Sequence, residues 1–235
     1  MNPIVLQLKG IRSGYDGVPV IRGIDLEVKA GEIFAMLGKN GMGKSTLLKT
    51  ILGYLDLQKG DVHLLGQKVN GLPPFRIARN KIAYTPQEQA LFQDLTVEEN
   101  LRLAVRSDSA MKEGLPRIDQ IFPFIPNRLK QRAGTLSGGE QKMLLVARAL
   151  IAKPRLILVD EISEGLQPSV ITRLAQVFRE ERDLNGTSIF LVEQNVKFAL
   201  SVADRYVVLK MGEIVDRGNT SERGLESKIV DQLSM

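Results

Sequence analysis

The stretch GKNGMGKST, residues 38–46, has the residue types and the spacing needed to bind the phosphate groups of a nucleotide. It matches the P-loop pattern of Gly, four residues, Gly, Lys and Ser or Thr, between a predicted strand and a predicted helix. Glycines let backbone N–H groups approach phosphate oxygens, and the helix N-terminus adds positive potential. Lys44 would add a charge against the β- and γ-phosphates, and the Ser45 hydroxyl would bind Mg²⁺. The predicted nucleotide-binding residues of this stretch are Gly38, Asn40, Gly41, Gly43, Lys44, Ser45 and Thr46.

Two carboxylates follow an apolar run in LILVDE, residues 156–161. Ligands of open α/β sheets collect at the carboxyl ends of the strands, so the metal of a nucleotide would lie there. We expect Asp160 to hold Mg²⁺ through water, and Glu161 to orient or deprotonate the attacking water. Together with the P-loop, this pair predicts nucleotide hydrolysis with Mg²⁺.

A second anion-binding surface is predicted in LSGGEQ, residues 136–141, which opens a long helix. A Ser and two glycines at a helix N-terminus present backbone N–H groups and positive potential. One nucleotide has no evident use for two such surfaces on one chain, so we expect this one to bind the ATP of another subunit. Its predicted residues are Ser137, Gly138, Gly139 and Glu140.

The stretch SIFLVEQNVK, residues 188–197, ends an apolar run with three polar residues, Glu193, Gln194 and Asn195. These residues could form a polar turn, or they could be the end of a strand that faces a ligand. We favour the second interpretation, because a parallel strand would bring Gln194 to the same sheet edge as Asp160 and Glu161.

The elements that position these residues are apolar strands that alternate with amphipathic helices. Between the strands LILVDE and SIFLVEQ, the stretch SVITRLAQVF places Val170, Leu174, Val177 and Phe178 on one helical face. Such alternation predicts a parallel sheet covered on both faces.

Composition narrows the class of protein further. The chain has 235 residues, of which 43% are hydrophobic, so it is long enough to bury a sizeable core. No apolar run approaches the roughly 18 residues of a membrane-spanning helix, and no signal peptide is evident. The absence of cysteine excludes disulfides and thiolate metal sites. The net charge of +5 favours anionic partners but does not choose between nucleotide, nucleic acid and membrane.

Between about residues 87 and 136 the pattern becomes helical. In TVEENLRLAV, Thr96 is a predicted N-cap and Glu99 completes a capping box. The polar stretch RSDSAMKEGLP, residues 106–116, is predicted to be a mobile connection. We interpret this part of the chain as an inserted helical lobe.

In the order and spacing of these motifs, nearly the whole chain resembles the ATP-binding cassette (ABC) family. GKNGMGKST resembles its Walker A motif, LILVDE its Walker B motif and LSGGEQ its signature. YTPQEQ is similar to the Q-loop, in which Gln87 approaches the metal. Tyr15 lies where the family stacks an aromatic ring on adenine. SEGLQP, residues 163–168, is similar to the D-loop at the dimer interface.

This resemblance implies an α/β fold of the P-loop NTPase type, with a mainly parallel sheet flanked by helices. It also implies an antiparallel β subdomain and the helical lobe. Residues 1–235 would form a single nucleotide-binding domain. Its core and β subdomain would comprise about residues 1–87 and 155–235, and the lobe about residues 88–154.

The resemblance also implies how the protein works. Two cassettes, identical or different, would face head to tail and hold two ATP molecules, each between one P-loop and the opposite signature. The metal ligands would be Ser45, Gln87 and Asp160, with Mg²⁺ as cofactor. The partners would be membrane permease subunits and, indirectly, an extracytoplasmic solute-binding protein. The chain would lie at the cytoplasmic face of a prokaryotic inner membrane.

Within the family, LFQDLTVEENL, the EGL of the D-loop and the LVEQN region resemble ATP-binding subunits of branched-chain amino-acid importers. Importers of urea and short amides share much of this pattern. We therefore expect an amino-acid importer, with a urea or short-amide importer as the alternative. The rivals are a cassette that exports lipid or drugs and, from another class, a nucleic-acid- or ribosome-associated ATPase. Such ATPases usually carry two cassettes, a long coiled coil or a zinc insertion. None of these is visible in the sequence, so no nucleic acid is expected as a partner.

Three positions depart from the commonest cassette pattern. Ile162 follows the catalytic Glu in place of Pro, and Gln167 stands in the D-loop in place of Asp. Gln194 occupies the switch position of a histidine, and the single His63 lies in another segment. Gln194 can donate a hydrogen bond but cannot carry a proton. The predicted catalytic residues are therefore Glu161 and Lys44, with Gln194 in an auxiliary role.

Overall fold

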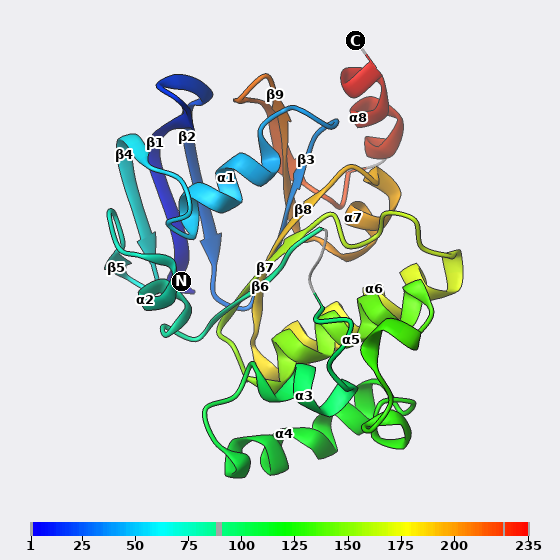
Figure 1. Cartoon of the computed structure of the whole chain (residues 1–235). Coiled ribbons are helices and arrows are strands. Elements are labelled where there is room, and N and C mark those ends of the chain that lie inside the picture. Colours follow the sequence, from blue (N-terminus) through cyan, green and yellow to red (C-terminus); the bar gives the residue numbers. More distant parts are fainter. Residues whose placement is uncertain (1, 88–90, 223, 235) are drawn as a thin grey trace.

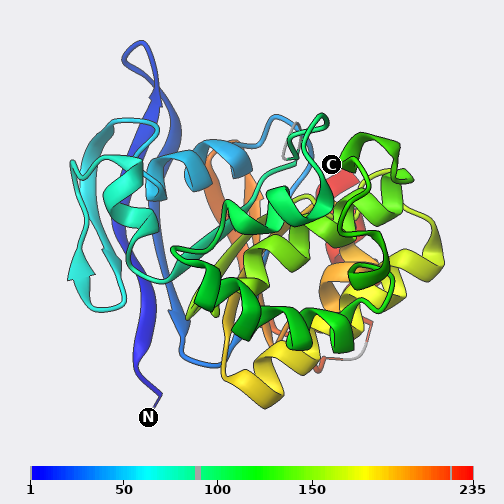
Figure 2. The same cartoon turned by 60° about the horizontal axis from the view of Figure 1, so that its bottom comes forward.

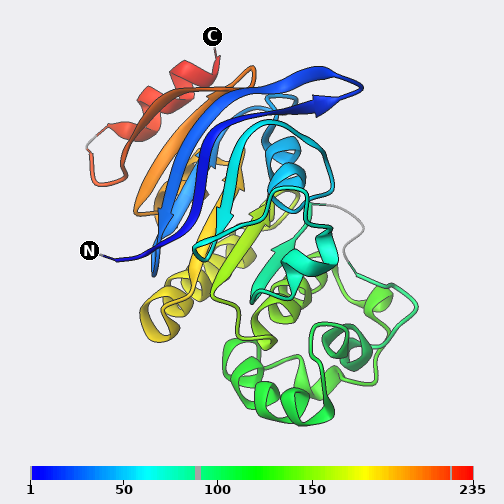
Figure 3. The ribbon, with the colours of Figure 1, turned by 90° about the vertical axis from the view of Figure 1, so that its left-hand side faces the viewer.

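The computed structural model describes residues 2–87, 91–222 and 224–234. The N-terminal half contributes an antiparallel four-stranded sheet with the order β2-β1-β4-β5. Figure 3 shows this sheet along one side of the molecule. Its strands are β1 (Ile4–Tyr15), β2 (Val18–Lys29), β4 (Leu57–Leu64) and β5 (Gln67–Lys68).

A second, six-stranded sheet has the order β10-β9-β3-β8-β7-β6. Five of its strands run parallel, and the edge strand β10 is antiparallel to β9. Strands β3, β7 and β8 are buried along their whole length, as apolar runs covered on both faces require. The predicted mainly parallel α/β fold is confirmed. The strands are β3 (Ile33–Leu37), β6 (Ile82–Thr85), β7 (Leu156–Asp160), β8 (Ser188–Glu193), β9 (Arg205–Lys210) and β10 (Glu213–Asn219).

Helices cover both faces of this sheet. The two sheets lie on either side of α1, while α6 and α7 pack on the opposite face of the large sheet (Figure 1). Helices α3, α4 and α5 gather at one end of the molecule (Figures 1 and 2). Within the described residues, no helix has the length and apolar character to cross a membrane. The helices are α1 (Lys44–Ile51), α2 (Pro74–Ala78), α3 (Val97–Arg102), α4 (Asp108–Ile121), α5 (Gly138–Ile151), α6 (Pro168–Asn185), α7 (Val196–Val202) and α8 (Leu225–Ser234).

The predicted mobile connection at residues 106–116 is wrong, because most of it belongs to helix α4. The buried residues of α4 recur at helical spacing, although polar residues separate them in the sequence. Gly114 lies against α5, where an added Cβ would come within 2.5 Å of Ile151 Cγ1. The close contact with α5 therefore stabilises a helix whose own sequence is a weak helix signal. The buried residues of α4 are Met111, Gly114, Ile118 and Ile121.

The predicted start of helix α3 is confirmed. The Thr96 side chain accepts a hydrogen bond from the Glu99 backbone, and the Glu99 carboxylate accepts one from the Thr96 N–H at 2.7 Å. This is the reciprocal pair of a capping box. The predicted beginning of the helical lobe, residues 88–90, lies outside the described residues. The division into a core and a lobe stays a prediction.

Candidate functional site

The P-loop connects the end of β3 to the start of α1, as its motif predicts. Gly43 is the N-cap of α1 and has φ 100°, a conformation that favours glycine. An added Cβ there would also approach Ile21 Cδ1 to 2.9 Å. Gly38 is similarly confined, because its Cβ would lie 2.9 Å from the Leu209 carbonyl oxygen. The glycines at these two positions therefore allow backbone geometry and packing that side chains would prevent.

Lys44 lies at the centre of this site. Its ammonium donates hydrogen bonds to the carbonyl oxygens of Gly38 and Lys39, each at 2.8 Å. It also forms an ion pair with Glu161, with 2.8 Å between Nζ and Oε1, and both side chains are buried. An ammonium has three donors, so these three oxygens satisfy it. A phosphate that bound Lys44 would replace the Glu161 carboxylate as its anionic partner.

Asp160 lies beside the P-loop, because β7 and β3 both border β8 in the parallel sheet. Its Oδ1 accepts a hydrogen bond from the Ser45 hydroxyl at 3.2 Å, and its Oδ2 accepts one from the Tyr84 hydroxyl at 3.3 Å. Burial raises the pKa of Asp160, and the charge of Glu161 acts in the same direction. Burial, together with Asp160, also raises the pKa of Tyr84, which stays protonated and can only donate here.

The oxygen atoms of this edge fit Mg²⁺. The Ser45 hydroxyl and the Asp160 carboxylate already lie within hydrogen-bond distance of each other. A hard cation with few protein ligands, completed by water and phosphate, needs only such a pair. Tyr84 was not predicted from the sequence. The sequence signal was its place at the start of YTPQEQ, three residues before Gln87, and the structure pairs it with Leu158 of β7.

Gln87 lies between the acidic pair and the signature helix. Its side-chain amide donates to Glu161 Oε2 at 3.1 Å and to Glu164 Oε2 at 2.7 Å. Its backbone carbonyl accepts a hydrogen bond from Lys142 Nζ on α5 at 2.7 Å. Gln87 therefore joins the Glu161 carboxylate to both the 163–168 segment and helix α5. The role of Gln87 as a metal ligand stays a prediction. The last two residues of the predicted Q-loop, 88 and 89, lie outside the described residues.

The signature forms the N-terminus of α5. Ser137 is the N-cap, and it forms a capping box with Glu140. Hydrogen bonds from Ser137 lower the pKa of Glu140, and the bond from the Ser137 backbone N–H has the largest effect. Glu140 also forms an ion pair with Arg128, with 2.8 Å between Oε1 and Nη1. Gly139 packs closely on α6, since its Cβ would lie 3.0 Å from Val170 Cγ2.

Within this chain, the signature is not part of the phosphate site. Ser137 and Gly138 are exposed, and an added Cβ on Gly138 would meet open space. Among the described residues, no hydrogen bond or ion pair joins Ser137 to Lys44. The predicted contact of Ser137, Gly138, Gly139 and Glu140 with the ATP of another subunit stays a prediction.

The three polar residues after the apolar run of β8 have three different environments. Glu193 is 1% exposed and ends β8, whereas Gln194 is exposed. The Asn195 side chain caps α7 by accepting a hydrogen bond from the Phe198 N–H at 3.1 Å. Burial raises the pKa of Glu193, and hydrogen bonds from Ser163 oppose this effect. Sequence reasoning assigned no role to Glu193, although a carboxylate that ends a buried strand is a visible signal.

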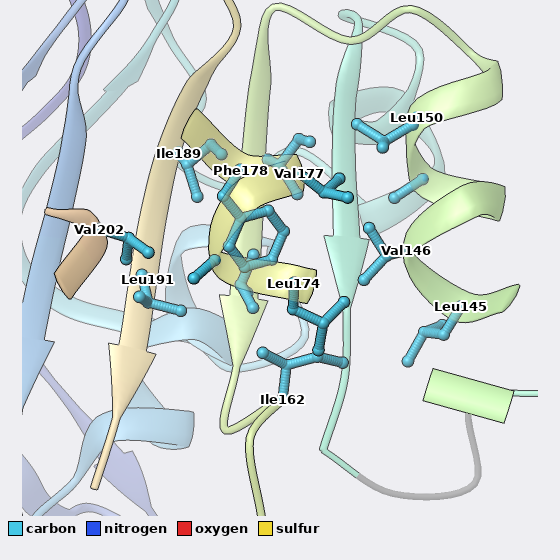
Figure 4. Packing of buried hydrophobic residues seen from close by; sticks show 14 of the residues in the cluster. Leu145, Val146, Leu150, Ile162, Leu174, Val177, Phe178, Ile189, Leu191 and Val202 are labelled. Carbon is cyan, nitrogen blue, oxygen red and sulfur yellow. The ribbon is translucent and has the colours of Figure 1, made fainter. Parts of the chain in front are cut away.

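The residues that depart from the common cassette pattern also have clear positions. Ile162 is fully buried and lies next to Leu174 in the core (Figure 4). This packing gives a physical reason for an apolar residue there. Gln167 is the N-cap of α6 but its side chain makes no capping bond. His63 lies in β4 of the other sheet.

Tyr15 ends β1 on the antiparallel sheet, opposite Val18, and is 44% exposed. Replacing Tyr15 by Ala should weaken ATP binding about fivefold, because a lost aromatic stack on a base costs about 1 kcal/mol. Tyr15→Phe should keep the affinity. Calorimetric titration of the purified chain with ATP measures both. Phe75→Ala is the matched control, because Phe75 is an exposed aromatic residue on α2. Equal affinities for Tyr15→Ala and Phe75→Ala would exclude adenine stacking.

Comparison with known proteins places this geometry in a family. A family model described as ABC transporter matches residues 21–164. The chain is 39% identical over 213 residues to the high-affinity branched-chain amino acid transport ATP-binding protein BraG of Pseudomonas aeruginosa, and the match covers 90% of this chain and 91% of that protein. It is 35% identical over 233 residues to the probable branched-chain amino acid transport ATP-binding protein LivF of Archaeoglobus fulgidus, with 98% of each chain covered.

A solved structure shares the fold. The dimeric post-hydrolysis state of an ATP-binding cassette bound to ADP and Pi superposes with a TM-score of 0.82. The match has 24% sequence identity and covers 92% of this chain and 99% of that one.

Proposed function

The chain belongs to the ABC transporter family, and from this premise we propose that it is the ATP-hydrolysing subunit of an importer for branched-chain amino acids. The family consists of ATPases, so the reaction is hydrolysis of ATP. The observation that carries the proposal is the cluster at one sheet edge in which the buried side chains of Lys44, Asp160 and Glu161 lie beside the half-buried Ser45. The class of solute rests on the two relatives named for branched-chain amino acid transport.

The chemistry follows from the positions of these side chains. Glu161 would accept a proton from the attacking water, and Lys44 would balance the charge that develops on the γ-phosphate. Ser45 and Asp160 would hold Mg²⁺, with Gln87 as the third ligand; the ion would stabilise negative charge on the phosphates. Gln194 would donate a neutral hydrogen bond from the end of β8.

ATP would be bound between two cassettes. The exposed N-terminus of α5, with Ser137 and Gly139, would face the γ-phosphate held by a second cassette. A solved cassette with the same fold is a dimer bound to ADP and Pi, which supports the pairing of two cassettes. Cassettes of this family dimerise and work with permease subunits. Whether the second cassette is a copy of this chain or a different one would be decided by the purified complex.

A groove of about 630 Å³ between β6 and helices α3 to α5 would receive a permease subunit. Basic side chains line it, among them Arg79, Arg106 and Lys153, together with the exposed apolar Leu103. Tyr84 of β6 also lines this groove, three residues before Gln87. A permease bound there would therefore be coupled to the ATP site. The chain would then lie at the cytoplasmic face of the inner membrane, and a solute-binding protein would act on the other side.

Purification from membranes through a tag on this chain tests the proposal. We expect the complex to contain permease subunits and a second cassette. After reconstitution into vesicles, ATP should drive uptake of leucine, isoleucine or valine. A Glu161→Gln complex is the matched control and should not transport.

Other outcomes separate the alternatives. ATP-driven uptake of urea or short amides, without uptake of amino acids, would show the related importer. Co-purification of this chain with the permease of a lipid or drug exporter would indicate export. Hydrolysis that RNA or DNA stimulates, with steep dependence on salt, would instead indicate a nucleic-acid-associated ATPase.

A further inference from the structure

Glu193 is a buried carboxylate to which the proposed mechanism gives no part. It is 1% exposed and pairs in register with Leu37 of β3, the last residue before the P-loop. Burying a charged group is costly unless hydrogen bonds or an opposite charge compensate it. Among the described residues, no Lys or Arg forms an ion pair with Glu193 within 4 Å. Its compensation must therefore come from hydrogen bonds.

The Glu193 carboxylate accepts hydrogen bonds from two residues, Ser163 and Asn195. Oε1 accepts from the Ser163 N–H at 3.0 Å, and Oε2 accepts from the Ser163 hydroxyl at 2.8 Å. Oε2 also accepts a longer bond from the Asn195 N–H at 3.4 Å. Backbone N–H groups can only donate, so this arrangement fits a carboxylate that acts as acceptor. Ser163 is itself 5% exposed.

These bonds hold the turn that carries Glu161. Glu161 has φ 45°, a left-handed conformation that is unfavourable for a residue with a Cβ. Its N–H donates to the carbonyl of Val192 at 2.9 Å, and two residues later Ser163 is bound by Glu193. Two consecutive residues of β8 therefore hold this turn. Val192 binds Glu161 itself, and Glu193 binds Ser163, two residues later.

Glu193 also connects to the P-loop and to the switch position. Its backbone carbonyl accepts a hydrogen bond from the Gly38 N–H at 3.2 Å, and Gln194 follows it in the chain. Ser163 begins the segment 163–168, which the family resemblance places at the dimer interface. One residue thus contacts the start of the P-loop and the start of that segment.

We propose that Glu193 is a positioning residue that fixes the turn carrying Glu161 and links the end of β8 to the 163–168 segment through Ser163. It acts on Glu161 through Ser163, which donates two hydrogen bonds to its carboxylate. The inference rests on the proposed function, because its consequence is the rate of ATP hydrolysis. Loss of the contact should misplace the Glu161 carboxylate while leaving the P-loop residues that bind ATP in place.

Two single variants and their combination test the inference in the tagged transporter. Glu193→Gln keeps the volume but replaces one acceptor oxygen by an NH₂ group, and Ser163→Ala removes only the hydroxyl. Each should lower kcat for ATP hydrolysis about tenfold, because misplacing the catalytic base by the loss of one charged hydrogen bond costs about that factor. KM for ATP should change by less than about twofold, because neither substitution removes a contact that binds ATP equally in the ground state and the transition state. The double variant should be no slower than the slower single variant.

Glu181→Gln is the matched control. Glu181 is also a buried carboxylate, 2% exposed, but it pairs with Arg117 and lies on α6. Its loss should lower the melting temperature and leave kcat unchanged. An unchanged kcat in both Glu193→Gln and Ser163→Ala would overturn the inference, and so would an equal loss of kcat in Glu181→Gln. Effects that simply multiply in the double variant would also overturn it.

A second measurement separates this inference from the proposed function. Amide hydrogen exchange at Ser163, followed in the full purified chain, should be faster in Glu193→Gln than in the unmodified protein. Equal exchange rates at Ser163 in the variant and in the unmodified protein would contradict the contact, independently of the ATPase activity. A transporter that hydrolyses no ATP before any substitution would contradict the proposed function, not the contact.

Discussion

Changing Glu161 to Gln should lower the rate of ATP hydrolysis by about a hundredfold or more, because a positioned general base contributes at least that factor. The amide keeps the size of the side chain and its capacity to accept one hydrogen bond from Gln87, but it cannot take a proton from water. Phosphate release by the purified transporter, with and without the substitution, measures the effect.

The same substitution should not weaken ATP binding. In the structure, Glu161 is the anionic partner of Lys44, at 2.8 Å, so a bound phosphate competes with it. Titration of the Glu161→Gln chain and of the unmodified chain with ATP compares the two affinities. We expect the Kd of the variant to equal or fall below that of the unmodified chain. A Kd raised tenfold or more would show that Glu161 holds the site together instead of serving catalysis.

Gln194→Ala provides the contrast. The exposed Gln194 can supply one neutral hydrogen bond, whose loss costs about 1 kcal/mol, or roughly a fivefold lower rate. If Gln194→Ala lowered the rate as much as Glu161→Gln, or more, the assignment of Glu161 as the principal base would be wrong.

Replacing Lys44 by Ala should weaken ATP binding by more than about a hundredfold, which corresponds to about 3 kcal/mol for charged hydrogen bonds to phosphate. The same change should destabilise the folded chain by about 3 kcal/mol, because it leaves the buried Glu161 carboxylate without its ion-pair partner. Calorimetric titration with ATP measures the first effect, and urea unfolding measures the second.

The double variant Lys44→Ala with Glu161→Gln separates these two effects. Removing the unpaired charge should recover most of the lost stability, whereas the affinity for ATP should stay low because the ammonium is still absent. Recovery of ATP binding in the double variant would mean that Lys44 acts only as the counter-charge of Glu161.

The geometry of the P-loop was predictable from the sequence because its causes are local. Gly43, at φ 100°, permits the turn that precedes α1, and α1 begins at the next residue. The apolar runs that end in Asp160 and Glu193 are buried strands, as predicted. Parallel strands present their carboxyl ends at one edge, so the meeting of Asp160 with Ser45 also followed from the pattern.

Helix α4 could not be predicted in the same way. Its polar sequence and the internal Pro116 disfavour a helix, and its buried face is narrow. What stabilises it lies elsewhere in the chain, in the packing of Gly114 on Ile151 of α5. Propensity is a weak signal when a contact of this kind outweighs it.

The sequence by itself determined the chemistry of this protein, because residue types at fixed spacing set which atoms can bind phosphate, hold a metal or accept a proton. Only the tertiary structure decided which charges face each other. Lys44 pairs with Glu161, and Ser163 binds Glu193, since strand β8 lies between β3 and β7. The order of strands depends on packing between distant segments, and no local pattern specifies it. The hydrogen bonds between Ser163 and Glu193 could therefore be seen only in the fold.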